Sequence, residues 1–283
     1  MGTLLEARRA NEGARRVGKS GSHSATGRRS RHGGGDGRLL RPPPVRGDLV
    51  SSRGGVYFAG GGFAAGVIIA TLTTALAELI GGYKFASTLP VPLGVSAADL
   101  VGLWGGLVGA AIAYSRSKGS GRVASDYGLT TLRWWDLPAG VAIGLACQYG
   151  LVPVVYYPLE TIDRHLAHQL SGPARTYTGA VHSVGGVVVL LILLAVAGPI
   201  VEELFFRGLL LRSLGAWFPS PIAIVLSAVL FGLAHFEAVQ FVGLAAFGVV
   251  LGVLAWTTRR LAPSIAAHAS FNAAAVLAVV HAR

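Results

Sequence analysis

The 283-residue sequence has a single cysteine, one methionine and charged side chains at only 13% of its positions. One cysteine, Cys147, excludes a disulfide framework and any cysteine-rich metal site. A soluble domain of this size carries roughly 25% charged residues. With 52% hydrophobic residues and a mean hydropathy of +0.58, the composition argues against an ordinary soluble globular protein.

The positive charge is concentrated at the amino terminus. Residues 1–53 hold twelve of the 24 Lys and Arg residues and four acidic residues, whereas the other 230 positions hold twelve basic and nine acidic residues. This segment is rich in Gly, Arg and Ser and poor in large apolar residues, so we expect a disordered basic tail and no signal peptide. It is interpreted as a solvated tail, a misplaced start codon or a cytoplasmic anchor to anionic lipid. A nucleic-acid arm is the least favoured reading, and no nucleic-acid partner is expected.

The remainder of the chain consists of long apolar runs. A membrane-spanning helix needs about 20 apolar residues, and the sequence offers about seven such segments. The expected spans are residues 56–79, 93–114, 137–158, 184–213, 220–238, 241–258 and 262–281. The sequence therefore predicts an all-α, polytopic transmembrane helical bundle, with N-terminal helices over 54–183 and a second group of helices over 184–283.

Loop charges indicate the orientation of this bundle. With the tail placed inside, eight of the twelve remaining basic residues lie on the inner side, in agreement with the positive-inside rule. They are Arg116, Lys118, Arg122, Arg133, Arg207, Arg212, Arg259 and Arg260. We expect a multi-pass protein of the plasma membrane or bacterial inner membrane with a cytoplasmic amino terminus, and we expect Trp134, Trp135, Trp217 and Trp256 near the inner interface.

Ionisable residues inside a bilayer are costly and are therefore functional candidates. Glu78 and Asp99 fall near the outer ends of spans, where solvation explains them, and Asp136 is expected to be a helix N-cap. Glu202 and Glu203 are adjacent within a strongly apolar span.

Three glycine pairs at four-residue spacing (Gly62 and Gly66, Gly140 and Gly144, Gly248 and Gly252) are expected only to allow close helix packing.

Helical spacing separates the two glutamates. Glu203 and Arg207 are four residues apart and can form an ion pair, which leaves Glu202 without that partner. An unpaired carboxylate in a low-dielectric site can act as a general base. The spacing therefore predicts a structural Glu203 and a catalytic Glu202.

Two further motifs carry polar residues in apolar spans, Phe231 with His235 and His268 with Asn272. If the fourth and fifth spans form a hairpin that turns near Trp217–Ser220, Glu202 and His235 lie at nearly equal depth. His268 lies about 10 Å from the inner boundary at helical rise. All three motifs are thus expected to converge in the inner leaflet.

The three motifs together resemble the CPBP family, which comprises the CAAX proteases and bacteriocin-processing membrane enzymes and is also called the Abi family. The family pattern is EExxxR, FxxxH and HxxxN on separate membrane helices. The matching residues lie within 184–281: Glu202, Glu203, Arg207, Phe231, His235, His268 and Asn272.

This resemblance implies an intramembrane (metallo)endopeptidase in which Glu202 and His235 activate a water. It implies that His268 and Asn272 bind or stabilise the oxyanion, and that Glu203 and Arg207 support the site together with Phe231. Glu202, His235 and His268 also form a ligand set that suits catalytic zinc. A metal-free glutamate mechanism uses the same residues, so the cofactor stays open.

Two other functions are compatible with these residues. A non-proteolytic membrane scaffold could keep the same helical core, and a proton-coupled transporter could use buried Glu, His and Arg as a relay. The expected partners of the favoured peptidase are the lipid bilayer and a peptide or protein substrate cleaved near the cytoplasmic face. The cleavage motif, prenyl recognition and oligomeric state are not indicated by the sequence.

Overall fold

The computed structural model describes residues 53–82, 91–162, 170, 179, 181 and 183–281. The predicted tail, apart from Arg53, lies outside the described residues. Every regular element in the described part is helical, as predicted. The first helices are α1 (Gly55–Gly81), α2 (Leu93–Lys118), the short α3 (Val123–Asp126), and the continuous run α4 (Asp136–Ala146), η2 (Cys147–Leu151) and α5 (Val152–Ile162), in which η2 is π-helical.

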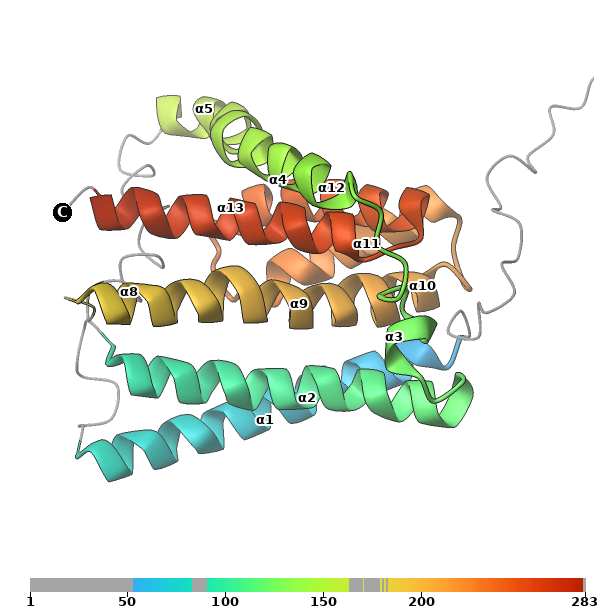
Figure 1. Cartoon of the computed structure of the whole chain (residues 1–283), viewed down its shortest axis with the longest axis horizontal. Helices are drawn as coiled ribbons and strands as arrows, with labels where there is room; N and C mark the ends of the chain where they lie inside the picture. The colour runs from blue at the N-terminus through green and yellow to red at the C-terminus, as the bar shows by residue number, and fades with distance from the viewer. Residues whose placement is uncertain are drawn as a thin grey trace, which may run out of the picture. The chain divides into compact units, whose positions relative to one another are not determined.

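The second half begins with one helix of 31 residues, Val184–Leu214. It consists of α8 (Val184–Leu191), the π-helical η3 (Ile192–Ala197), α9 (Gly198–Glu203), the π-helical η4 (Leu204–Leu210) and α10 (Leu211–Leu214). It is followed by α11 (Ser220–Leu233), α12 (Phe241–Thr258) and α13 (Ala262–His281). Figure 1 shows α8, α9 and α10 lying between α2 and α13.

Six of the described helices are long and apolar enough to cross a membrane. They match six of the seven predicted spans. The remaining predicted span, 220–238, corresponds to α11. This helix is only 14 residues long and ends at Leu233, so the predicted span extends too far at its carboxyl end. The chain leaves α11 through a turn in which Phe236 adopts the left-handed conformation, with φ 55°. His235 consequently lies in this turn rather than within a helix.

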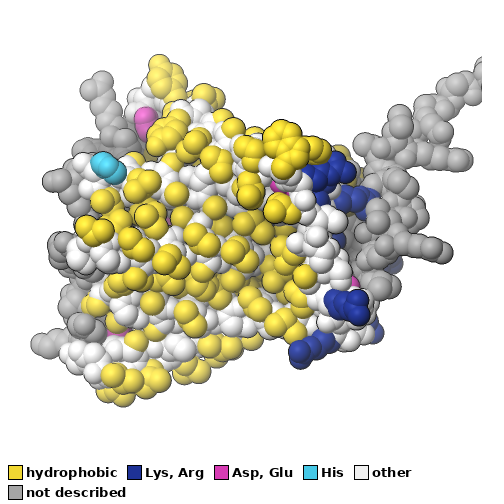
Figure 2. All heavy atoms as spheres, viewed as in Figure 1, with side chains coloured by type: hydrophobic (Ala, Val, Ile, Leu, Met, Phe, Trp, Pro, Cys, Tyr) yellow, Lys and Arg dark blue, Asp and Glu magenta, His cyan; other side chains and the backbone are white. Residues whose placement is uncertain are grey.

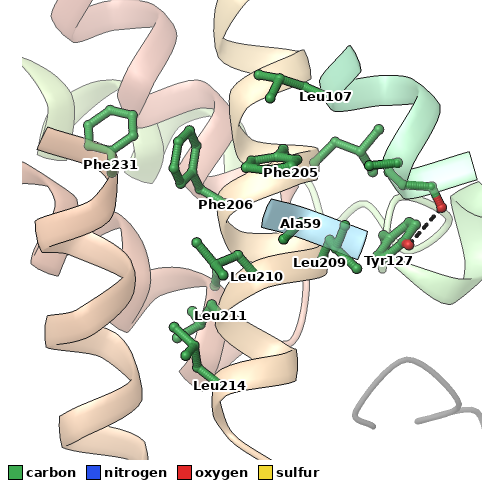
Figure 3. Close-up of a cluster of buried hydrophobic side chains, with 14 of the residues drawn as sticks. Ala59, Leu107, Tyr127, Phe205, Phe206, Leu209, Leu210, Leu211, Leu214 and Phe231 are labelled. Atoms are coloured by element: carbon green, nitrogen blue, oxygen red, sulfur yellow. Dashed lines mark hydrogen bonds between the residues drawn. The ribbon is translucent and has the colours of Figure 1, made fainter. Parts of the chain in front are cut away.

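The core is built around η4 and α10. All seven residues of η4, Leu204–Leu210, are buried, because this stretch is enclosed by other helices rather than facing lipid on one side. Figure 3 shows Phe205, Phe206, Leu209 and Leu210 pointing in different directions from this helix toward residues of its neighbours. Tyr127 closes the cluster at one side, and its hydroxyl donates to the carbonyl oxygen of Ala111 at 2.8 Å.

The basic residues gather at one end of the bundle, where α3 and the end of α10 lie (Figures 1 and 2). There the guanidinium of Arg212 donates to the carbonyl oxygens of Asp126, Tyr127 and Arg259 at 3.1–3.5 Å. It thereby ties the α2–α4 connection to the α12–α13 turn. Gly128 sits in this contact with φ 75°, and a Cβ there would lie 2.6 Å from the Arg259 carbonyl oxygen.

Two carboxylates stabilise this end. Burial alone would raise the pKa of Asp126, but hydrogen bonds from Ser115, Ser120 and nearby backbone amides outweigh it and lower the pKa below its usual value. Asp136 was predicted as an N-cap, whereas the cap position is Trp135 and Asp136 is the first helical residue. Asp136 is 1% exposed and pairs with Arg260 at 2.7 Å, a contact that links the start of α4 to the start of α13.

All three glycine pairs lie in close helix contacts, as predicted. Gly62 and Gly66 face α2, and a Cβ on either would meet Ala110 or the backbone of Leu103. The other two pairs face α13 and α11 in the same way. The absence of side chains at these positions lets the helix backbones approach within van der Waals distance.

The α1–α2 contact gives a direct test of this packing. A Cβ at Gly106 would collide with the backbone of Gly66, whereas no described atom lies within 4 Å of a Cβ at Gly109, three residues further along α2. We expect Gly106→Ala to destabilise the detergent-solubilised protein by about 1–3 kcal/mol through overpacking. The control Gly109→Ala is expected to be neutral or slightly stabilising, because alanine favours helix. Equal unfolding midpoints for the two variants would contradict the packing.

Candidate active site

A buried ion pair lies at the centre of the bundle. The carboxylate of Glu203, at the end of α9, accepts a hydrogen bond from Arg207 at 2.8 Å, and both side chains are fully buried. Arg207 also donates to the carbonyl oxygen of Gly248 in α12 at 3.2 Å, and its guanidinium lies 4.3 Å from the ring centre of Phe231 in α11. The predicted pair therefore exists, and it joins three helices.

Glu203 also orients His268 of α13. The Nδ1 of His268, which is 2% exposed, lies 3.1 Å from the Oε1 of Glu203. An ionised carboxylate can only accept, so Nδ1 carries the hydrogen and the Nε2 of a neutral imidazole presents a lone pair. This Nε2 lies 3.7 Å from the Oε2 of Glu202.

His235 is oriented in the same sense by a different acceptor. Its Nδ1 lies 2.8 Å from the carbonyl oxygen of Phe231, four residues earlier, and a carbonyl can only accept. The Nε2 of His235 therefore also presents a lone pair, 4.0 Å from the Oε2 of Glu202. The Phe231 ring lies edge-on between the two imidazoles, with ring centres 4.8 Å and 5.5 Å away. The carbonyl oxygen of Phe231 thus fixes the orientation of the His235 ring, and the Phe231 side chain packs against both imidazoles.

Glu202 has the free position that the spacing predicted. Its side chain is 21% exposed, and its Oε2 is buried without a hydrogen-bond partner among the described residues. The two imidazole nitrogens at 3.7 Å and 4.0 Å are too far for direct hydrogen bonds. At this separation a single water can be hydrogen-bonded to both the Glu202 oxygen and an imidazole nitrogen, so the arrangement is suited to holding and activating a water.

Asn272 contacts the long helix that carries Glu202. Its Nδ2 donates to the carbonyl oxygen of Leu194 at 2.8 Å. Leu194 belongs to the π-helical η3, where the wider turn leaves a carbonyl available to a side chain. In the structure Asn272 fastens α13 to η3 with one hydrogen of its amide, and its part in oxyanion binding stays a prediction.

The same residues can be tested as a zinc site. Their donor atoms and the hydrogen bonds on both Nδ1 atoms suit zinc. Ligand atoms of tetrahedral zinc at about 2.0–2.1 Å lie about 3.4 Å apart, whereas both nitrogens lie further than this from the Glu202 oxygen. Within the described ranges no group of three or more His, Cys, Asp and Glu side chains is arranged to hold a metal ion.

The convergence of the three motifs also bears on the predicted hairpin. The chain turns between Leu214 and Ser220, as expected, and Glu202 and His235 meet across it. Glu202 stands twelve residues before the end of α10, and its neighbour His268 stands six residues after the start of α13. The end of α10 is thus six residues further from the site than the start of α13. At 1.5 Å rise per residue, the hairpin therefore extends about 9 Å beyond the start of α13. Glu78 and Asp99, which were assigned to solvation, take no part in these contacts.

Two residues near Glu202 were not singled out from the sequence. Gly198 lies one turn before it, and Trp104 of α2 packs against this glycine. Trp104 lies in the middle of a span, away from the interfaces at which tryptophans were expected. Its indole N–H, a hydrogen-bond donor placed within an apolar helix, is the signal that could have identified it.

Residues 184–274 match the family model described as Type II CAAX prenyl endopeptidase Rce1-like. This segment is similar to the CAAX protease family. The matched segment contains all three motifs, and the match supports an intramembrane protease acting on a peptide or protein substrate. No curated protein and no solved structure matches the chain significantly. The division into residues 54–183 and 184–283 stays a prediction, although α4 packs along α13 and α2 along α9.

The central ion pair makes a sharp stability test possible. We expect Arg207→Met to destabilise the protein by about 3–5 kcal/mol, because Glu203 is left as a buried charge without its cation. The double variant Glu203→Gln with Arg207→Met is expected to recover much of this loss, since both charges are removed. Unfolding midpoints in detergent measure both effects. A double variant that is less stable than Arg207→Met alone would contradict the pairing.

Proposed function

We propose that the protein is an endopeptidase that cleaves a peptide or protein near the cytoplasmic membrane face, using a water activated by Glu202 and His235. The observation that carries the proposal is the unpartnered Oε2 of Glu202, which faces two imidazole nitrogens that present lone pairs.

The chemistry follows from these positions. The water lies between Glu202 and His235, and Glu202 accepts one of its protons as the oxygen attacks the scissile carbonyl carbon. The tetrahedral intermediate then collapses as the carbon–nitrogen bond breaks, and the proton held by Glu202 passes to the leaving amine. His235 orients the water through its Nε2 lone pair, and its hydrogen bond to the Phe231 carbonyl oxygen keeps the proton on Nδ1 and fixes the orientation of the ring.

Glu203 is unsuited to the same role. Its Oε1 is shared by Arg207 and His268, and its side chain is fully enclosed. A carboxylate stabilised by a cation at 2.8 Å is a weak base, and a water cannot reach it without displacing its partners. Its role in the proposal is to hold His268 and to anchor the helix that presents Glu202.

The cytoplasmic side follows from the charges. By their positions at the helix ends, the basic end of the bundle carries Arg116, Lys118, Arg122, Arg133 and the Arg259–Arg260 pair. Lysine and arginine are enriched in cytoplasmic loops. The site lies closer to this end along α13, with His268 six residues from its first residue. Substrate and water are therefore proposed to enter from the cytoplasm.

The first experiment compares new peptide termini in membranes that contain the wild-type protein or Glu202→Ala. We expect termini that depend on the wild-type protein to disappear with Glu202→Ala, because the general base is lost. The matched control is Glu78→Ala, another glutamate within a span but away from the site, which should leave the termini unchanged. Glu202→Ala should unfold at the wild-type temperature. Identical termini with wild type and Glu202→Ala would refute the proposed mechanism.

Metal dependence is tested separately. We propose a metal-free step, because the three donor atoms are spaced more widely than zinc ligands. Treatment of the purified protein with 1,10-phenanthroline is therefore expected to leave cleavage unchanged, and elemental analysis should find less than one zinc per chain. Loss of cleavage with the chelator and its recovery on adding Zn²⁺ would instead assign zinc to Glu202, His235 and His268.

A further inference from the structure

Trp104 carries a buried hydrogen-bond donor that the packing does not use. It lies in the middle of α2 and is 9% exposed. Its Nε1 is buried and has no hydrogen-bond partner among the described residues. Buried tryptophan N–H groups usually find a partner, and an unpaired donor is especially costly in a helix that crosses a bilayer. This donor therefore needs an explanation.

The donor lies beside the Glu202 site. A Cβ on Gly198 would be 3.4 Å from the Cζ2 of Trp104 and 3.7 Å from the Oε1 of Glu202. The indole and the carboxylate therefore border the same stretch of bare backbone. In an indole ring Cζ2 and Nε1 are bonded to the same carbon, so the N–H lies on the same edge of the ring as the atom that approaches Gly198. A side chain at position 198 would contact both groups.

The free oxygen of Glu202 and the two imidazole nitrogens that face it are all arranged as acceptors. The Nε2 atoms of His235 and His268 present lone pairs, and the free oxygen of Glu202 accepts as well. Asn272 already donates one amide hydrogen to Leu194. Peptide hydrolysis requires a fixed donor for the carbonyl oxygen, which gains negative charge as the carbon becomes tetrahedral. The Nε1–H of Trp104 is a donor that is not bound to any acceptor among the described residues.

We propose that the Nε1–H of Trp104 donates a hydrogen bond to the carbonyl oxygen of the scissile peptide bond and stabilises the oxyanion; this rests on the proposed function. The water oxygen forms the new bond to carbon, its proton goes to Glu202, and the carbonyl electron pair moves onto the oxygen that Trp104 contacts. The indole keeps its proton throughout. Trp104 lies outside residues 184–274, so the N-terminal helices would contribute a catalytic residue to the site.

The test uses a fluorogenic peptide that spans a cleavage site found by the comparison with Glu202→Ala membranes. Trp104→Phe keeps an aromatic ring but removes the N–H. We expect kcat to fall by about 10²–10³-fold, the typical loss for one oxyanion donor, with KM nearly unchanged. Trp256→Phe is the matched control, since this indole packs over Gly215 at the basic end and should be replaceable without loss of kcat.

A second variant separates hydrogen bonding from shape. β-(3-Benzothienyl)alanine at position 104 replaces the N–H by sulfur within a bicyclic ring of nearly the same outline, and it serves as the decisive measurement if Trp104→Phe folds poorly. We expect it to lose kcat as Trp104→Phe does. Wild-type kcat in this variant, with Glu202→Ala inactive, would overturn the role of Trp104 and leave the proposed function intact. Full activity of Glu202→Ala would overturn both.

Discussion

The structure depends on one buried charge pair. Arg207 and Glu203 are both fully enclosed, and a lone charge at either position would be too costly to keep inside the bundle. Their contacts reach α12 through Gly248 and α13 through His268. The pair therefore fixes how the helix containing η4 sits between its neighbours, and with it the direction in which the preceding residue points.

That preceding residue is Glu202. Its carboxylate has no cation because Arg207 pairs with the neighbouring Glu203. Adjacent helical residues point about 100° apart, so the helix that places Glu203 on Arg207 turns Glu202 toward His235 and His268. Each of these imidazoles has its Nδ1 bound to an acceptor. The site thus combines one unpaired carboxylate with two nitrogens of fixed orientation, which is a preorganised arrangement for a water.

Much of this could be predicted from the sequence. Apolar runs located six spans to within four residues at each end, and the four-residue spacing of Glu203 and Arg207 is enough to foresee their contact. Other features depend on long-range packing. The early end of α11 at Leu233 leaves no trace in hydropathy, the pairing of Asp136 with Arg260 joins residues 124 positions apart, and the contact of Asn272 with Leu194 requires a π-helical turn. Trp104 reaches the site from a helix that carries none of the motifs.

The central claim is that two adjacent glutamates have separate tasks, one chemical and one structural. The most direct measurement is a comparison of Glu202→Gln with Glu203→Gln, in which cleavage and the unfolding midpoint are determined on the same purified samples. The account predicts that Glu202→Gln abolishes cleavage at a wild-type midpoint, whereas Glu203→Gln lowers the midpoint markedly. A stable, fully active Glu202→Gln variant, or a Glu203→Gln variant with the wild-type midpoint, would contradict it.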